Sequence, residues 1–448
     1  MSKEPSLNDH KERIEELIDR HRVDDLKTAL RDMHPADIAE ILSDLSEEDL
    51  NAVFKHIDSK KAGTVLDEMG PEAQKDVIES IDETELAHII NGLPSDEQAD
   101  IVATVEEEKR DRILGKLDAE SSRDIGELLQ YSADTAGGLM TTEIITLSPE
   151  VEVKEAIGIW RREGDPGMSH FLYIVNESHR LLGYVGARAL LMAGDERKLG
   201  SIMTTDVKVV DVNTDQQEVA QMFRKYDLIV LPVVDEQNAL KGAITVDDVL
   251  EVIRDENSED FYRMAGTGEK DPFHETILKK SLRRLPWLSI TLIGGMLTVK
   301  VMQSFDTLLN QIIVLTFFIP VIIATAGNVA IQSATVIVRG LALGEAKKSR
   351  LLSNTMREVG VGVVVGLFCS VISGVGAGLF INSAELGFVI GISMMCAITL
   401  ASFNGVLIPL FCDFAGIDPA IVSGPFITTL NDVLGVLIYL GIGTLILL

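Results

Sequence analysis

Five long apolar stretches in the C-terminal part of the sequence restrict its fold more than any other feature. They cover about residues 285–304, 312–338, 358–381, 387–412 and 420–447. A helix needs about 20 apolar residues to cross the hydrocarbon core of a bilayer, so each stretch is long enough for one crossing. Lys300 lies near the end of the first stretch, where its long side chain can reach the interface. The sequence therefore predicts a membrane domain of five helices.

Basic residues around these stretches predict the orientation of the chain. They cluster before the first stretch and between the second and third, at Lys279, Lys280, Arg283, Arg284, Arg339, Lys347, Lys348, Arg350 and Arg357. The loop between the first two stretches and the loop at 382–385 contain no Lys or Arg. Because basic loops stay in the cytosol, we expect a cytosolic N-terminus and a C-terminus outside.

Residues 1–280 have the composition of a soluble and strongly acidic body. They contain 62 of the 69 acidic residues but only 32 of the 40 basic ones. Such a charge repels phosphates, which argues against nucleic acid as a partner. The three cysteines all lie in apolar segments, so a disulfide framework or a thiolate metal site is not expected. The charged start of the chain has no apolar signal segment, and we expect this part in the cytosol.

A 12-residue repeat runs seven times through residues 34–117. Apolar residues recur at its eighth, ninth and twelfth positions, as in Ile41, Leu42 and Leu45 of the first copy. This spacing places three apolar side chains on one face of a short helix, and turn or cap residues such as Ser46 and Asp82 mark the restarts. The pattern predicts a superhelical stack of short helices with an acidic surface, which serves either as a scaffold or in regulation.

A second and longer repeat follows a Gly-containing linker near residue 137. The sequence pattern that starts at Met140 recurs from Met203, and that of residues 172–191 recurs at residues 231–250. The first copy has about four extra residues near 164–169. Each copy is predicted to contain a strand, a helix, two short strands and a final helix. The pair resembles tandem CBS domains, a regulatory module that often senses nucleotides or ions. Asp247 and Asp248 can also simply cap the last helix.

An acidic run continues from the second copy toward the first apolar stretch. On a helix from about residue 248, Asp248, Glu251, Asp255 and Glu259 share one face. Like charges at this spacing repel each other. The usual explanation is a solvated acidic face, but carboxylate oxygens also bind hard divalent cations.

Polar residues inside the apolar stretches are costly in hydrocarbon and usually face a pore or a bundle interior. Asn328 and Gln332 lie one turn apart in the second stretch, and Thr428 and Asp432 lie one turn apart in the fifth. Asp432 is the only acidic residue well inside any stretch. Its alternative role is that of a structural carboxylate neutralised by protonation or hydrogen bonding.

The order of these parts resembles the MgtE family of magnesium channels or transporters over nearly the whole chain. The fifth-stretch pattern Pro-Phe-x-x-Thr-x-x-Asp and the second-stretch pattern Thr-Ala-Gly-Asn carry the resemblance within the membrane part. The resemblance implies a multidomain membrane protein. Its parts are an α-superhelical N domain (1–133), two α/β CBS domains (134–202 and 203–262), a connecting or plug helix (263–284) and a five-helix transmembrane domain (285–448).

The resemblance also implies a homodimer in the lipid bilayer of the bacterial inner membrane, with a pore on its two-fold axis. Asp432 would hold a largely hydrated Mg²⁺ with the carbonyl of Thr428, while Asn328 and Gln332 would contact the water shell of the ion. Regulatory Mg²⁺ would bind among the cytosolic parts and close the pore. The matching residues are Asp248, Glu251, Glu256, Glu259, Asp260, Asp227, Asp418, Asp96 and Asp100. Gln217 stands where the family tends to have an acid. The CBS pair is a candidate site for ATP.

The expected function is Mg²⁺-selective uptake driven by the membrane potential and closed by intracellular Mg²⁺. Two alternatives remain open at this stage, a transporter of another divalent cation such as Co²⁺ and a membrane-anchored Mg²⁺ sensor that transports nothing. The sequence contains no nucleophile elbow and no phosphate-binding Gly loop, so we do not expect an enzyme.

Overall fold

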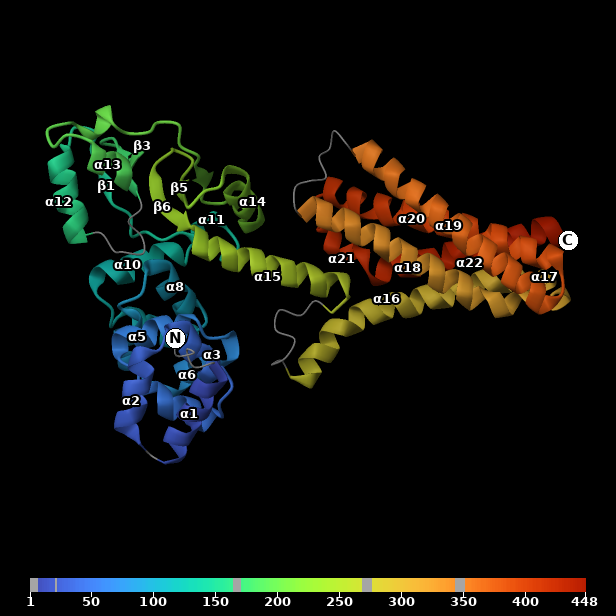
Figure 1. Cartoon of the computed structure of the whole chain (residues 1–448), viewed down its shortest axis with the longest axis horizontal. Helices are drawn as coiled ribbons and strands as arrows, with labels where there is room; N and C mark the ends of the chain where they lie inside the picture. The colour runs from blue at the N-terminus through green and yellow to red at the C-terminus, as the bar shows by residue number, and fades with distance from the viewer. Residues whose placement is uncertain (1–6, 21, 164–170, 268–275, 343–350) are drawn as a thin grey trace, which may run out of the picture. The chain divides into compact units, whose positions relative to one another are not determined.

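The computed structural model describes residues 7–20, 22–163, 171–267, 276–342 and 351–448, and it separates into two units, Met1–Val252 and Ile253–Leu448. Figure 1 colours the first from blue to green and the second from yellow to red. Each unit is described by itself. The extra residues at 164–169 and the basic residues Lys347, Lys348 and Arg350 lie outside the described residues.

Short helices build the first part of unit 1, as the 12-residue repeat predicts. After α1 (Leu7–Asp19) and α2 (Val23–Asp32), the seven copies form seven helices, and α10 (Ala119–Leu128) follows them. Alternate helices stack, α3 on α5, α5 on α7 and α7 on α9. The seven are α3 (Pro35–Ser43), α4 (Glu47–Phe54), α5 (Ser59–Asp67), α6 (Pro71–Ser80), α7 (Glu83–Ile90), α8 (Ser95–Ala103) and α9 (Glu107–Leu114).

Burial of the repeated apolar pair explains this stack. Leu42, Val65 and Ile90 are completely buried, and nearly all the other eighth and ninth positions are buried too. Some helix starts are fixed by side-chain caps, as at α7, where the Asp82 carboxylate accepts from the amides of Thr84 and Glu85. Each helix is too short to be stable alone, so the buried stripe between neighbours holds the superhelix together.

The second half of unit 1 contains two sheets of the same topology, which confirms the long repeat. In one sheet β1 (Thr146–Leu147) pairs parallel with β2 (Phe171–Val175), and β2 pairs antiparallel with β3 (Leu181–Gly186). In the other, β4 (Val210–Asp211), β5 (Val230–Val234) and β6 (Leu240–Thr245) repeat this order. The helices are α11 (Ala136–Leu139), α12 (Val153–Glu163), α13 (Ala187–Met192), a 3-10 turn η1 (Leu199–Ser201) and α14 (Gln216–Tyr226).

The connecting helix differs from its expected bounds of 263–284. It is α15 (Val246–Met264), which starts as the last helix of the second CBS copy and carries the acidic run. Gly266 ends it, because its backbone adopts a φ of 71°, a left-handed conformation that suits glycine. The next helix begins at Ile277, and residues 268–275 lie outside the described part.

Five helices of unit 2 are long and apolar enough to cross a membrane, as the sequence predicts. They are α16 (Ile277–Gln303), α18 (Leu315–Ala342), α19 (Leu351–Ile381), α20 (Ala384–Phe414) and α22 (Pro425–Leu447), with a short α17 (Asp306–Gln311) after the first. The fifth stretch is divided, because α21 (Pro419–Ser423) ends at Gly424 and α22 restarts at Pro425. The fifth stretch therefore forms two helices rather than one.

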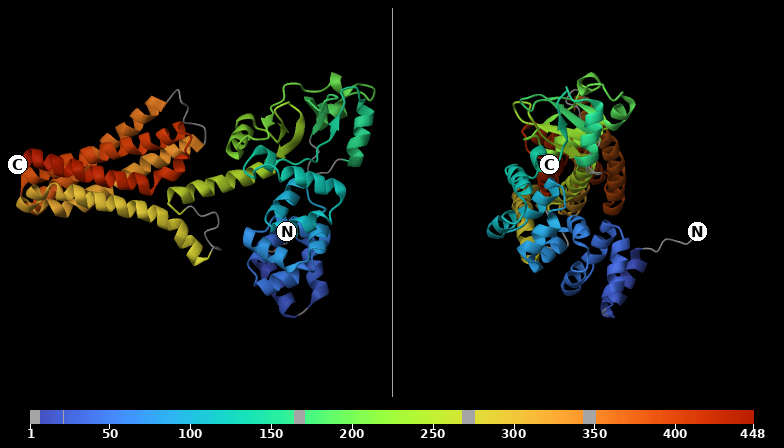
Figure 2. Two further views of the ribbon diagram at one scale, coloured as in Figure 1. Left: turned by 180° about the vertical axis from the view of Figure 1, so that it is seen from behind. Right: turned by 90° about the vertical axis from the view of Figure 1, so that its left-hand side faces the viewer.

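The centre of unit 2 is formed by α18, α20 and α22, which run alongside one another in Figures 1 and 2. Each of the three packs against the other two. Glycine allows the closest contacts, since a Cβ atom on Gly405 of α20 would lie only 2.4 Å from the carbonyl oxygen of Ala330 on α18. Helices that pack in lipid use such small residues to bring their backbones together.

Candidate ion-binding sites

The carboxylate of Asp432 is the central feature of the membrane unit. Its side chain is half-buried on α22 and makes no hydrogen bond or ion pair with any of the described residues. On the facing helix α18, an added Cβ atom on Gly327 would lie 4.0 Å from Oδ1 of Asp432 and 3.9 Å from Cγ2 of Thr428. The structure therefore brings Asp432, Thr428 and the Gly327 region of α18 together.

Thr428 uses its hydroxyl within its own helix. Its Oγ1 donates to the carbonyl of Pro425 at 3.0 Å, and the Oγ1 of Thr429 donates to the same carbonyl at 2.6 Å. The broken start of α22 is thus stabilised by two hydroxyls. The hydroxyl proton of Thr428 is thus used within the helix, while the lone pairs of its oxygen stay available to a cation beside Asp432.

Asn328 and Gln332 lie on the exposed side of α18, together with the exposed Ala324, Ile331 and Thr335. Both amides were expected to face the ion, and no described residue covers them. Amide side chains facing lipid would leave several hydrogen-bonding groups without partners. This stripe therefore requires a polar medium or a second molecule against it.

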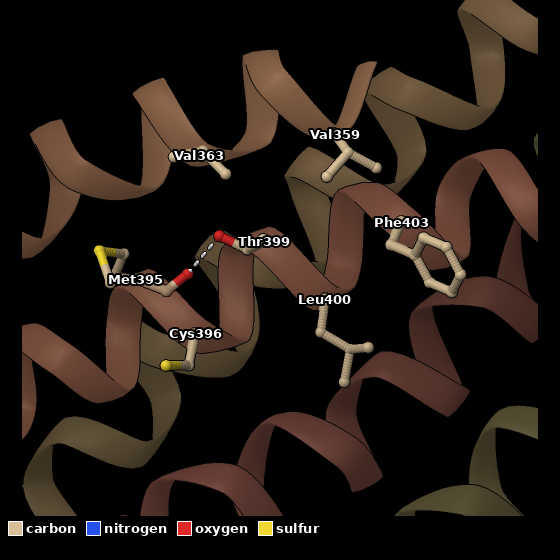
Figure 3. Close-up of a pocket in the computed structure, with 7 residues that line it drawn as sticks. All are labelled: Val359, Val363, Met395, Cys396, Thr399, Leu400 and Phe403. Atoms are coloured by element: carbon tan, nitrogen blue, oxygen red, sulfur yellow. Dashed lines mark hydrogen bonds between the residues drawn. The ribbon is translucent and has the colours of Figure 1, made fainter. Parts of the chain in front are cut away.

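An apolar cavity elsewhere in the membrane unit lacks the polar groups that an ion site needs. About 490 Å³ of space lies between α19 and α20, lined by Val359, Val363, Met395, Cys396, Thr399, Leu400 and Phe403 (Figure 3). Its one hydroxyl, on Thr399, donates to the Met395 carbonyl at 2.8 Å. No charged group lines this cavity, so it cannot replace the hydration shell of a cation.

Carboxylates gather in unit 1 where the solenoid, the CBS pair and the first turns of α15 meet. The predicted Asp96, Asp100, Asp248 and Glu251 interact there with two acids that the sequence reasoning missed, Asp67 and Glu97. Asp96 is buried, and its Oδ1 has no hydrogen-bond partner. Asp67 ends α5, where a negative charge opposes the helix dipole, and that unfavourable position was the available signal.

Burial and mutual repulsion raise the pKa values of these acids. Burial and then the charge of Asp248 raise the pKa of Asp96 to about 8, and burial and then Asp67 raise that of Glu97 to about 9. For Asp67 and Asp100 the values are about 7 and about 6, because burial and the charge of Glu251 act on both. Burial also raises the pKa of Asp248, although the Thr245 hydroxyl donates to it at 2.5 Å. Removing this repulsion requires protons or a cation.

A second group of acids lies in unit 2, at the end of α15. Arg263 donates to Glu259 and to Asp418, and Asp418 also accepts from the amide of Ala420 at 2.8 Å as the cap of α21. Burial and then the charge of Asp418 raise the pKa of Asp260 to about 6. Arg263 was missed as a member of this group, although it stands one turn after Glu259. The predicted ligands Glu259 and Asp418 therefore already have a cationic partner.

Asp227 and Glu256 complete the predicted set. Asp227 is exposed and caps the end of α14 with a φ of 50°, and within the described part of the chain no hydrogen bond or ion pair connects it to the acids of the solenoid. Glu256 contributes charge to the group around Asp260. Among the described residues, no three His, Cys, Asp or Glu side chains are arranged to hold a metal ion directly. The carboxylates are near enough to repel, but they do not form a ready coordination shell.

Comparisons with known proteins agree with this arrangement of parts. Family models match three regions, the MgtE intracellular N domain at 33–134, CBS domains at 136–196 and 199–255, and the MgtE divalent cation transporter domain at 319–442. A magnesium transporter MgtE of Enterococcus faecalis is 38% identical over 323 residues, which cover 72% of this chain and 71% of the relative. The chain belongs to the MgtE family.

Other MgtE relatives give the same result. The magnesium transporters MgtE of Bacillus subtilis and Thermus thermophilus are 35% and 36% identical, each over 72% of both chains. A crystal structure of the cytosolic domain of the Mg²⁺ channel MgtE in complex with ATP is 32% identical, with a TM-score of 0.51, and covers 53% of this chain and 98% of that one. With its five apolar helices, this MgtE-family chain is a multi-pass membrane protein.

Proposed function

We propose that the chain carries Mg²⁺ across the membrane through a pathway lined by α18 and α22, with Asp432 as its ion-binding carboxylate. The observation that carries the proposal is the state of Asp432, an acid inside a membrane helix with no partner among the described residues and with Gly327 opposite it. A carboxylate inside a membrane-spanning helix is costly when it is charged and unpaired, unless a cation binds beside it. The three relatives named magnesium transporters support the choice of ion.

The chemistry of the site suits an ion that keeps its water. Mg²⁺ prefers six oxygen ligands at about 2.1 Å and loses water reluctantly. One carboxylate and a few carbonyl or amide groups are too few to replace that shell, but they can accept and donate hydrogen bonds to it. Asp432 would then neutralise the hydrated ion, and the Thr428 carbonyl and the Asn328 and Gln332 amides would contact its water.

The exposed amides of α18 support a homodimer with the pathway on its two-fold axis. A second copy placed there would face Asn328 and Gln332 with its own pair and would enclose water between the two subunits. Two Asp432 carboxylates would then share one divalent ion. The basic loops favour a cytosolic N-terminus and an inner-membrane location.

Regulation by cytosolic Mg²⁺ is the second part of the proposal. The acids around Asp96 lack a direct coordination shell, but a hydrated Mg²⁺ bridges carboxylates through its water and relieves their repulsion. Such binding in unit 1 and near Asp260 would hold α15 and close the pathway. Several weak sites suffice, because a shift from 1:99 to 99:1 needs only about 5.5 kcal/mol of differential binding. ATP at the CBS pair would tune this response, as the ATP complex of the related cytosolic domain suggests.

Mg²⁺ flux into proteoliposomes tests the transport proposal. The full chain should load a Mg²⁺ indicator, and Asp432→Asn, which keeps the shape but removes the charge, should reduce the rate by about 100-fold. If the full chain gives no Mg²⁺ flux, the transport proposal is wrong and the alternative of a membrane-anchored sensor that transports nothing is favoured. Saturable Co²⁺ flux combined with block of Mg²⁺ flux by Co²⁺ would favour a transporter of another divalent cation.

A further inference from the structure

Two asparagines form a buried hydrogen bond between the helices of the membrane unit. Asn404 of α20 and Asn431 of α22 are only 7% and 2% exposed. The Nδ2 of Asn404 donates to Oδ1 of Asn431 at 3.1 Å, and the Nδ2 of Asn431 donates to the carbonyl of Ile427 at 2.8 Å. Neither residue has a role in the ion pathway described above, yet Asn431 directly precedes Asp432.

The partner helix α20 is itself fixed to α18 at the same level of the bundle. Gly405, next to Asn404, allows the close approach to the Ala330 carbonyl. One turn earlier in α18, Gly327 faces Asp432. Ser402 of α20 is hydrogen-bonded to Ser333 of α18 at 3.0 Å and donates to the Glu358 carbonyl of α19 at 2.9 Å. The helix that holds Asn404 is therefore anchored to the other helix of the proposed pathway.

We propose that Asn404 and Asn431 are a positioning pair, which fixes the rotation of α22 about its axis and so directs Asp432 toward Gly327. This inference rests on the proposed function of Asp432. Successive residues on a helix differ by about 100° in direction, so a fixed direction for Asn431 also fixes that of Asp432. Apolar contacts are non-directional, whereas a single interhelical hydrogen bond has one favourable geometry.

The cost of breaking this pair explains why it can act as an orientation lock. A lone amide in the bundle core would lose its partner in a medium without water. The second hydrogen bond, to Ile427, ties the Asn431 side chain to the backbone of its own helix. Rotation of α22 therefore moves the amide away from Asn404 rather than letting the side chain follow.

Leucine variants separate positioning from stability, because leucine has the same branching of heavy atoms as asparagine. Asn404→Leu or Asn431→Leu alone leaves the other asparagine buried without its hydrogen-bond partner and should lower the melting temperature in detergent. The double variant leaves no unpaired amide, so its melting temperature should recover. Its half-saturating Mg²⁺ concentration for flux should nevertheless stay raised by about three- to tenfold, the range expected from the strength of interhelical hydrogen bonds in membranes.

The matched control is the other buried pair, Ser333→Ala with Ser402→Ala, which joins α18 to α20 without α22. It should change the melting temperature but leave the half-saturating Mg²⁺ concentration unchanged, because the close contact of Gly405 with the Ala330 carbonyl still holds α20 against α18. A double leucine variant that recovers both quantities would overturn the positioning role. The positioning role would also be overturned if the serine double variant shifted the half-saturating Mg²⁺ concentration as strongly as the double leucine variant.

A readout independent of transport separates this inference from the proposed function. In a background with Cys369, Cys396 and Cys412 replaced, Thr428→Cys reports the direction of α22 by its rate of modification with a charged methanethiosulfonate. The double leucine variant should change this rate about threefold or more, and the serine control should not. Unchanged modification overturns the positioning role. Absent Mg²⁺ flux with a changed rate overturns only the proposed function.

Discussion

Gly327 of α18 lies directly opposite the carboxylate of Asp432, and a methyl group added to Gly327 would sit 4.0 Å from Oδ1. This distance is an ordinary van der Waals contact, so Gly327→Ala should fold normally. The methyl group would nevertheless occupy space beside the carboxylate that a hydrated Mg²⁺ needs. We expect Mg²⁺ flux to fall by roughly tenfold in Gly327→Ala, by the loss of about 1.4 kcal/mol of ion binding.

Gly295→Ala on α16 is the matched control for this substitution. No atom lies within 4 Å of the Cβ position at Gly295, and alanine is the better helix former. Its flux should equal that of the unmodified chain. Equal flux in Gly327→Ala would mean that the ion does not pass this face of Asp432.

A second glycine predicts a steric effect with a defined rescue. A Cβ atom on Gly294 of α16 would lie 1.7 Å from Cγ2 of Thr429 on α22. Gly294→Ala should therefore destabilise the membrane unit by about 1–3 kcal/mol, the usual cost of overpacking. Thr429→Ser removes only that methyl group and keeps the hydroxyl that bonds Pro425. The double variant should regain most of the melting temperature, and failure to do so would show that α16 and α22 are not packed this closely.

The elements of this fold were predictable where one periodicity dominates the sequence. The 12-residue repeat gave seven helices because its apolar positions are the buried ones, and the five spans followed from length alone. The acidic helix expected from about residue 248 is α15, whereas the bounds 263–284 given to the connecting helix differ from it, since α15 runs out of the second CBS copy without a break to Met264. Gly266 is the signal in the sequence for this end, because a glycine in the left-handed conformation commonly terminates a helix.

The residues of the candidate sites were also predictable only where a local feature of the sequence marks them. Asp432, Asn328 and Gln332 could be proposed from the sequence because a polar residue in an apolar stretch stands out. Asp67 was missed although its position at the end of α5 was a signal, and Glu97 was missed because an acid among many acids in the solenoid carries none until distant repeats meet. Arg263 was missed for a similar reason, because its pairing with Asp418 joins residues 155 positions apart.

Arg263 predicts how the end of α15 responds to Mg²⁺. It pairs with Glu259 and Asp418, and its charge also acts on Glu256 and Asp260. Arg263→Ala leaves these carboxylates to repel, so α15 should detach without Mg²⁺ and reattach when Mg²⁺ replaces the guanidinium. Single-channel recordings should show a higher open probability in Mg²⁺-free cytosolic solution, with closure preserved at high Mg²⁺. Arg254→Ala, an exposed arginine on the same helix, should leave both unchanged.

The acids of unit 1 predict a pH dependence of stability in the absence of Mg²⁺. The pKa values of Asp100, Asp67, Asp96 and Glu97 are raised to about 6, 7, 8 and 9, so the folded state binds more protons than the unfolded one. Their stabilising contribution is complete below their ordinary pKa of about 4, and it is lost progressively as the pH rises from about 4 to about 9, where the last of them has deprotonated in the folded state. Thermal unfolding of the full chain in chelator should show this decline, and millimolar Mg²⁺ should abolish it.

Neutral variants identify the groups responsible for that decline. Asp67→Asn with Glu97→Gln removes two of the acids and should flatten the dependence between about pH 6 and pH 9. Glu155→Gln, an exposed acid on α12, should leave the slope as it is. A rise of stability with pH in the unmodified chain would contradict the raised pKa values.

The exposed stripe on α18 predicts cross-linking between two copies of the chain. In the cysteine-free background, Asn328→Cys places a thiol on the helix face that the proposed two-fold axis covers. Oxidation in membranes should join two chains, because residues on such an axis meet their own symmetry mates. Val364→Cys, on an exposed face of α19, should stay monomeric under the same conditions. If Val364→Cys cross-links and Asn328→Cys does not, the dimer uses α19, and the amides of α18 need another explanation.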